Sequence, residues 1–146
     1  MKLARMTELV RSPRDVWLLM RMTAWATVLP LLKFALPLPR LVRLMSNARS
    51  HRRRPTRERR VSELAQLLYG ASRPRFTDNC LERSLVTYRY LGRIGAEPTL
   101  IVAVAKDGDD VTGHVWVTVD GNPVQDAPDF LAQYVPLVTF GPDGRA

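Results

Sequence analysis

Cysteine and histidine are scarce in this chain of 146 residues, which contains one cysteine, Cys80, and two histidines, His51 and His114. A single cysteine excludes an internal disulfide framework, and these three residues do not have the spacing of a zinc site. The stretch from Met1 to Arg5 leads into no apolar signal-peptide core with a small-residue cleavage site. We therefore expect a cytoplasmic protein that holds no metal and no other cofactor.

Acidic residues are scarce in the first part of the chain. Residues 1–60 have 15 Lys and Arg against 3 Asp and Glu, whereas residues 61–146 have 7 against 11. The two ranges therefore have net charges of +12 and −4. Such a split predicts a functional boundary near residue 60 and makes the basic range a candidate for binding an acidic surface. Its densest basic run, residues 52–60, is equally typical of a solvated linker.

Long uncharged apolar runs are lacking as well. The longest one in the apolar N-terminal region, residues 22–32, is too short to span a bilayer. Ser12 followed by Pro13 is typical of a helix start, and residues 16–29 continue as a helix that Pro30 is expected to end or kink. We interpret this region as packing helices, with an interfacial membrane helix as the less favoured alternative.

The second part of the chain predicts two helices and then strands. Residues 61–69 have apolar side chains at helical spacing, and a second helix is expected from Cys80 to about Gly92. Residues 99–105 form a continuous β-prone run that a turn connects to the strand of His114. This order predicts an α+β domain at residues 61–146, preceded by a basic, apolar helical region and linker at residues 1–60.

Cys80 lies where a loop is expected to become a helix. Thr77 or Asp78 can cap that helix, which places Cys80 in its first turn, where unpaired N–H groups and the helix dipole favour a thiolate. His114 follows on a strand and Asp126 on the next segment, so the order is that of a Cys-His-Asp triad. A lone cysteine is also typical of a small buried apolar residue.

The turn after Val119 decides which carboxylate reaches His114, because a slip of one residue moves side chains to the other face of a strand. The sequence permits three loops, at residues 120–122, 121–122 or 120–121. The first loop puts Asp126 on the face of His114, and the second puts Asp129 opposite His114. The third loop puts Asp126 on the other face. Turn preferences alone do not choose among them.

The motifs Cys80-Leu81-Glu82-Arg83-Ser84 and His114-Val115-Trp116-Val117, with Asp126 twelve residues after the histidine, resemble those of the transglutaminase-like leader peptidases of lasso-peptide biosynthesis. The resemblance covers about residues 61–130. One departure is Gly113, where alanine is commoner in the family. The resemblance favours Asp126 over Asp129. It also implies a transglutaminase-like or papain-like core, in which a helix carrying the cysteine packs on an antiparallel sheet carrying His and Asp.

The resemblance implies a cysteine peptidase that removes the leader from a ribosomally made lasso precursor peptide. Cys80 would be the nucleophile, His114 the acid and base, and Asp126 the residue that orients the histidine. Supporting roles are expected for four neighbours: Asn79, Arg83, Ser84 and Trp116. Two alternatives remain, a transglutaminase-like or arylamine-type acyltransferase with the same triad, and a non-catalytic basic module that binds nucleic acid or membrane.

The family also has a split form, in which a separate small protein recognises the leader. Residues 1–60 lack a strand-rich pattern, so the chain resembles that form. The implied partners are the precursor peptide, the separate leader-binding protein and the ATP-dependent lasso cyclase, whereas nucleic acid and membrane contact are not expected. Five residues are candidates for contacting a partner: Trp17, Trp25, Arg52, Arg53 and Arg54.

Overall fold

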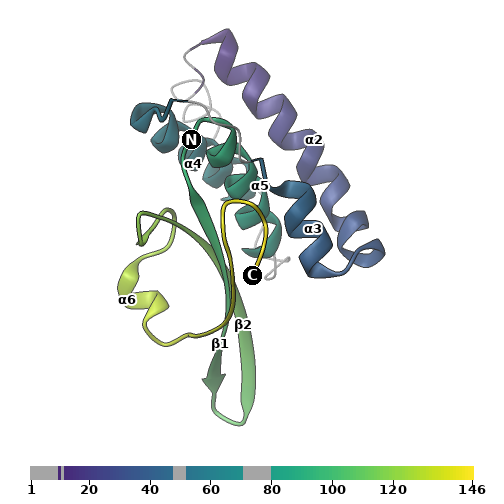
Figure 1. Ribbon diagram of the computed structural model, residues 1–146, viewed down its shortest axis with the longest axis vertical. Helices are drawn as coiled ribbons and strands as arrows, with labels where there is room; N and C mark the ends of the chain where they lie inside the picture. Colours follow the sequence, from purple (N-terminus) through teal and green to yellow (C-terminus); the bar gives the residue numbers. More distant parts are fainter. Residues whose placement is uncertain (1–9, 11, 48–51, 71–79) are drawn as a thin grey trace.

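The computed structural model describes residue 10 and residues 12–47, 52–70 and 80–146. In chain order its elements are the helices α2 (Pro13–Ala35), α3 (Leu38–Met45), α4 (Pro55–Gly70) and α5 (Cys80–Arg93), the strands β1 (Pro98–Asp107), β2 (Asp110–Val119) and β3 (Asn122–Pro123), the short helix α6 (Pro128–Leu131), and strand β4 (Val135–Phe140). Figure 1 shows α2 on the outside of the helical part, with the β1–β2 hairpin extending away from the helices.

Helix α2 begins as the sequence predicts and ends later than expected. Ser12 caps it by accepting a hydrogen bond from the Asp15 amide at 3.3 Å, and proline occupies the first turn. The expectation that Pro30 would end the helix was wrong, because α2 continues to Ala35. Leu29 is fully buried and Leu32 packs against the same core, so tertiary packing on both sides of Pro30 offsets the hydrogen bond that proline removes.

Helix α4 begins at Pro55, several residues before the predicted start of a helix. Residues 55–60 of the basic run are therefore helical rather than part of a linker. Arg60 anchors this end of α4 to α2 through a 2.9 Å ion pair with Asp15, and it also pairs with Glu63. The sequence pattern missed this turn because its side chains are charged and give no apolar periodicity.

The strands form one antiparallel sheet in the order β3-β2-β1-β4. Val119 pairs with Asn122, so the loop between β2 and β3 consists of Asp120 and Gly121. Both residues have positive φ, 54° and 77°, as a tight two-residue hairpin requires. The third of the three loops that the sequence permits is therefore the one found.

Helix α5 lies at the centre of the core. Its buried face contacts the inner side of the sheet and helices α2, α3 and α4. Fully buried apolar side chains come from all of these elements: Met22, Leu29, Val42, Met45, Leu64, Leu85, Leu91 and Leu100. Elements of residues 1–60 and of residues 61–146 thus share one core, and their division into two functional units stays a prediction.

A charged pair ties α2 to the first turn of α5. The Lys33 ammonium lies 2.9 Å from the Glu82 carboxylate, whose side chain is 7% exposed. Burial, with a smaller contribution from the Glu82 charge, raises the pKa of Tyr69 well above its usual range. The tyrosine therefore stays neutral beside this carboxylate, and the pair holds α2 against the helix that carries Cys80.

Candidate active site

Cys80 is the first residue of α5. Its thiol is free and partly buried, and the side chain packs against the edge of the main core. The first N–H groups of a helix have no partner within the helix and favour negative charge that develops beside them. The expected cap at Thr77 or Asp78, and the supporting residue Asn79, lie outside the described residues.

His114 and Asp126 are brought together. The Nε2 atom of His114 lies 3.3 Å from Oδ2 of Asp126, and the two side chains are only 13% and 12% exposed. With Nε2 engaged by the carboxylate, Nδ1 is the ring nitrogen left to exchange a proton with a nucleophile. The structure thus brings His114 and Asp126 into contact, and the catalytic roles of both residues stay predictions.

Asp126 reaches His114 although the loop found was expected to put it on the other face. That expectation assumed a strand that continues through Asp126, whereas β3 ends at Pro123. Beyond Pro123 the alternation of side chains no longer applies, and the chain turns toward His114. Asp129, the rival carboxylate, is exposed in the first turn of α6 and forms no hydrogen bond with His114 in the part of the chain that the structure describes.

Arg83 connects the Cys80 helix to this pair. Its Nη2 atom lies 2.9 Å from both carboxylate oxygens of Asp126, so Asp126 is shared by Arg83 and His114. Arg83 follows Cys80 by three residues, and residues at that spacing are neighbours on one helix face. The contact therefore links the first turns of α5, which begins at Cys80, to the carboxylate that is bonded to His114.

Ser84 fastens α5 to β2 beside the histidine. Its hydroxyl is fully buried and donates to the backbone carbonyl of Val115 at 2.8 Å. Because Val115 directly follows His114, this bond fixes the distance between the helix start and the strand at the level of the site. The motif thus contributes two structural contacts, one from Arg83 to Asp126 and one from Ser84 to the histidine strand.

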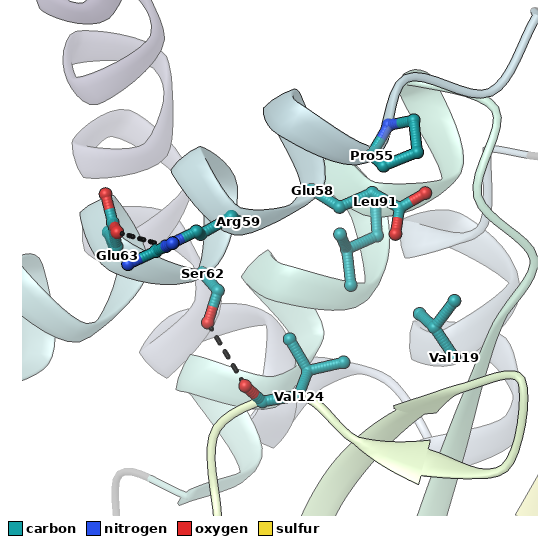
Figure 2. A pocket seen from close by; sticks show the side chains of 8 residues that line it. All are labelled: Pro55, Glu58, Arg59, Ser62, Glu63, Leu91, Val119 and Val124. Carbon is teal, nitrogen blue, oxygen red and sulfur yellow. Dashed lines mark hydrogen bonds and ion pairs between the residues drawn. The ribbon is translucent and has the colours of Figure 1, made fainter.

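Helices α4 and α5 hold the segment that carries Asp126. The Gln125 amide donates to the Thr87 hydroxyl at 3.0 Å, and the Ser62 hydroxyl donates to the Val124 carbonyl at 3.4 Å. Figure 2 shows the Ser62 bond at the wall of a pocket of about 370 Å³ that lies between α4, α5 and the β2–β3 hairpin. Sequence reasoning missed these contacts, because nothing in the local pattern marks Ser62, Thr87 or Gln125 as partners.

Aromatic rings surround His114 on the outer face of the sheet. Trp116 stacks at 6.0 Å between ring centroids, and Phe130 and Tyr134 approach to 5.3 and 5.1 Å. Trp116 was expected beside the site from strand alternation. Phe130 and Tyr134 were missed, because they come from α6 and the turn after it, where no periodicity relates them to the strand. Together the rings restrict the imidazole to one orientation.

The candidate partner residues separate into two groups. Trp17 is 62% exposed on α2, and Arg52 and Arg54 are exposed before α4. Trp25 faces inward, with the Arg89 guanidinium 4.5 Å from its ring centroid. Arg53 is occupied by two acids, since it lies 2.6 Å from both Glu58 and Asp120.

Two further properties concern ligands and membranes. In the described ranges, no three His, Cys, Asp or Glu residues gather as metal ligands. By length and composition alone, α2 could cross a membrane. The core helix of a soluble protein and a signal sequence can have the same length and composition. Arg21 and Lys33 interrupt the apolar segment in the sequence, but α2 as a whole is long and apolar enough to span a bilayer.

The fold is α+β, with a cysteine-bearing helix packed on an antiparallel sheet whose histidine is bonded to an aspartate. Comparison with protein families agrees with this class. The family described as the transglutaminase-like superfamily matches residues 24–139, and the chain belongs to it. Members of this superfamily are generally cysteine-dependent enzymes. No curated protein and no solved structure matches the chain.

We predict that Asp126→Asn slows alkylation of Cys80 by iodoacetamide near neutral pH, whereas Asp129→Asn does not. In the predicted roles, His114 takes the thiol proton as the sulfur reacts, and the Asp126 carboxylate orients the ring for that transfer. Because Cys80 is the only cysteine, the rate measured by mass spectrometry reports this thiol alone. An equal effect of the two substitutions on the alkylation rate would show that Asp126 has no special role at the site.

Arg83→Gln should lower the free energy of unfolding by about 1–3 kcal/mol, because it leaves the mostly buried Asp126 carboxylate with one partner fewer. Arg59→Gln is the matched control, since it breaks an arginine-carboxylate pair whose arginine is 86% exposed. That variant should change stability by less than about 0.5 kcal/mol. Urea unfolding measures both, and equal losses would contradict a special role for Arg83.

Proposed function

We propose that this chain is a cysteine peptidase that removes the leader from a ribosomally synthesised lasso precursor peptide, so that a separate cyclase can act on the core. The observation that carries the proposal is the Asp126 carboxylate, which joins Arg83 of the Cys80 helix to His114. The superfamily supports a cysteine-dependent enzyme, and the resemblance of the motifs around Cys80 and His114 supports the finer assignment.

In the proposed reaction, the Cys80 sulfur attacks the carbonyl carbon of the scissile peptide bond while His114 takes the thiol proton. Collapse of the tetrahedral intermediate breaks the C–N bond, and His114 gives the proton to the leaving amine. Water then attacks the Cys80 thioester, again with His114 as base, which releases the leader as a carboxylic acid and restores the thiol. Asp126 orients the ring and stabilises its protonated form.

Negative charge that develops on the carbonyl oxygen would be stabilised at the start of α5. The Cys80 backbone N–H is the first donor that we propose, because it belongs to the unpaired N–H groups at the helix N-terminus. The helix dipole acts in the same direction on the thiolate and on the oxyanion. The proposed support from Asn79 stays a prediction.

Cys80→Ala should leave a folded protein with no measurable leader removal, since it deletes the reacting sulfur and replaces it with a smaller apolar side chain. The assay is mass spectrometry of a lasso precursor incubated with the chain and a leader-binding protein, and circular dichroism verifies folding. His114→Ala should have the same outcome. Cleavage by Cys80→Ala at the wild-type rate would end the proposal.

The superfamily also favours a second candidate, transfer of the acyl group from Cys80 to an amine. Both reactions pass through the same thioester and differ only in the acceptor. Adding a primary amine to the cleavage assay separates them. A peptidase yields the free acid as its main product, whereas an acyltransferase yields the amide and accumulates thioester when the amine is omitted.

We also propose that a separate leader-binding protein presents the precursor, and that the lasso cyclase acts next. The described part of residues 1–60 consists of α2, α3 and the start of α4, which differs from a winged helix with strands. The outer face of α2 offers exposed apolar side chains to such a protein, among them Trp17, Met20, Leu31 and Phe34. Presentation on a second protein makes the encounter of leader and thiol effectively intramolecular.

Cleavage should therefore be at least about tenfold faster with the leader-binding protein than without it, at equal precursor concentration. Trp17→Ala should reduce this stimulation. Leu137→Ala is the control, because it removes a similarly exposed apolar side chain from β4. Initial rates with and without the partner measure the effect, and efficient site-specific cleavage by the chain alone would contradict the division of labour.

A further inference from the structure

Arginines line an open pocket at the end of the helical part that lies away from Cys80. The pocket has a volume of about 340 Å³, and its described lining consists of Arg52, Arg54, Arg57, Arg93 and Ile94. The first three precede or begin α4, and the last two lie at the end of α5. No carboxylate is among these lining residues. Guanidinium groups that share one cavity repel one another, and an anion between them relieves that repulsion.

The arginines of the basic run, residues 52–60, form two groups: those that pair with an acid and those that do not. Acids neutralise its other arginines, since Arg53 pairs with Glu58 and Asp120, Arg59 pairs with Glu63, and Arg60 pairs with Asp15 and Glu63. In contrast, the structure shows no ion pair with any described residue for Arg52, Arg54 or Arg57. The three arginines of the basic run that lack an acidic partner, Arg52, Arg54 and Arg57, thus all line the pocket.

The α4 terminus adds to the attraction for an anion. Helix α4 is 16 residues long and begins at Pro55, so the positive end of its dipole lies beside Arg54 and Arg57. Arg93 is already favoured by the C-terminal end of α5, and the unpaired arginines at the start of α4 have no such compensation. Guanidinium groups bind carboxylates through two parallel hydrogen bonds, which makes clustered carboxylates a fitting ligand.

We propose that this arginine pocket binds an acidic segment of the peptide substrate, outside the residues that flank the scissile bond. The assignment to substrate rests on the proposed function, whereas anion binding does not. Cys80 and Arg93 are at opposite ends of α5, which separates them by about 20 Å along the helix. An extended peptide needs at least about six residues to cover that distance, so one peptide of sufficient length can occupy the thiol and the pocket together.

The binding test uses the full chain and a fluorescently labelled peptide with four consecutive glutamates, followed by anisotropy. The same peptide with four glutamines should bind at least about tenfold more weakly. Arg54→Gln combined with Arg57→Gln should weaken binding of the glutamate peptide by roughly tenfold, from exposed charge pairs that each contribute up to about fivefold. Arg59→Gln is the matched control on the same helix and should change binding by less than about twofold.

Three outcomes would overturn the proposal. Equal binding of the glutamate and glutamine peptides would exclude an anion site. A loss with Arg59→Gln as large as that with the pocket variant would assign binding to net charge rather than to the pocket. Tighter binding of a single-stranded oligonucleotide than of the glutamate peptide, lost in the same pocket variant, would assign the pocket to nucleic acid.

A kinetic test connects the pocket to cleavage. With a lasso precursor whose acidic cluster lies about six residues from the cleaved bond, the Arg54→Gln, Arg57→Gln variant should raise KM severalfold and leave kcat unchanged. A fall in kcat with unchanged KM would contradict a substrate-binding role. If the wild-type chain cleaves no precursor even with the leader-binding protein present, the proposed function fails, while the anisotropy measurement still decides the anion site.

Discussion

The candidate site depends on one carboxylate, that of Asp126, which is shared between a guanidinium from α5 and an imidazole from β2. The two partners lie on elements that are otherwise held together by apolar packing, which is not directional, and by the Ser84–Val115 hydrogen bond. A charged hydrogen bond adds a direction and a distance. Because both side chains of the His114–Asp126 pair are largely buried, solvent screens the pair less than it screens the exposed pairs of the basic run.

The surrounding structure is arranged to hold that carboxylate. Gln125 and Val124, just before Asp126, are bonded to α5 and α4, and Ser84 bonds α5 to the residue after His114. The Lys33–Glu82 pair extends the network to α2, so an N-terminal helix also helps to position the Cys80 helix. The superfamily match, over residues 24–139, includes the second half of α2 as well. The basic helices are part of the same packed core.

The arginines of the chain divide into those that form ion pairs within the fold and those that are available to a ligand. Arg53, Arg59, Arg60 and Arg83 are each matched by an acid and stabilise contacts between or within elements. Arg52, Arg54 and Arg57, which line the pocket between α4 and α5, are not matched by acids in the described ranges. The net charge calculated from the sequence counts paired and unpaired arginines equally. Only the pairing distinguishes a charge that holds the fold from one that is available to a ligand.

The sequence by itself determined the features that depend on neighbouring residues. These include the Ser12 cap, a helix at Cys80, the strands on either side of the hairpin loop, and an α+β order of elements, because capping and periodicity act over a few positions. Tertiary structure decided the rest. It continued α2 through Pro30, selected the loop at Asp120 and Gly121, ended β3 at Pro123 so that Asp126 could turn toward His114, and placed Phe130 and Tyr134 against that ring. Each of these outcomes depends on contacts between segments far apart in the chain, and local preference contains no information about such contacts.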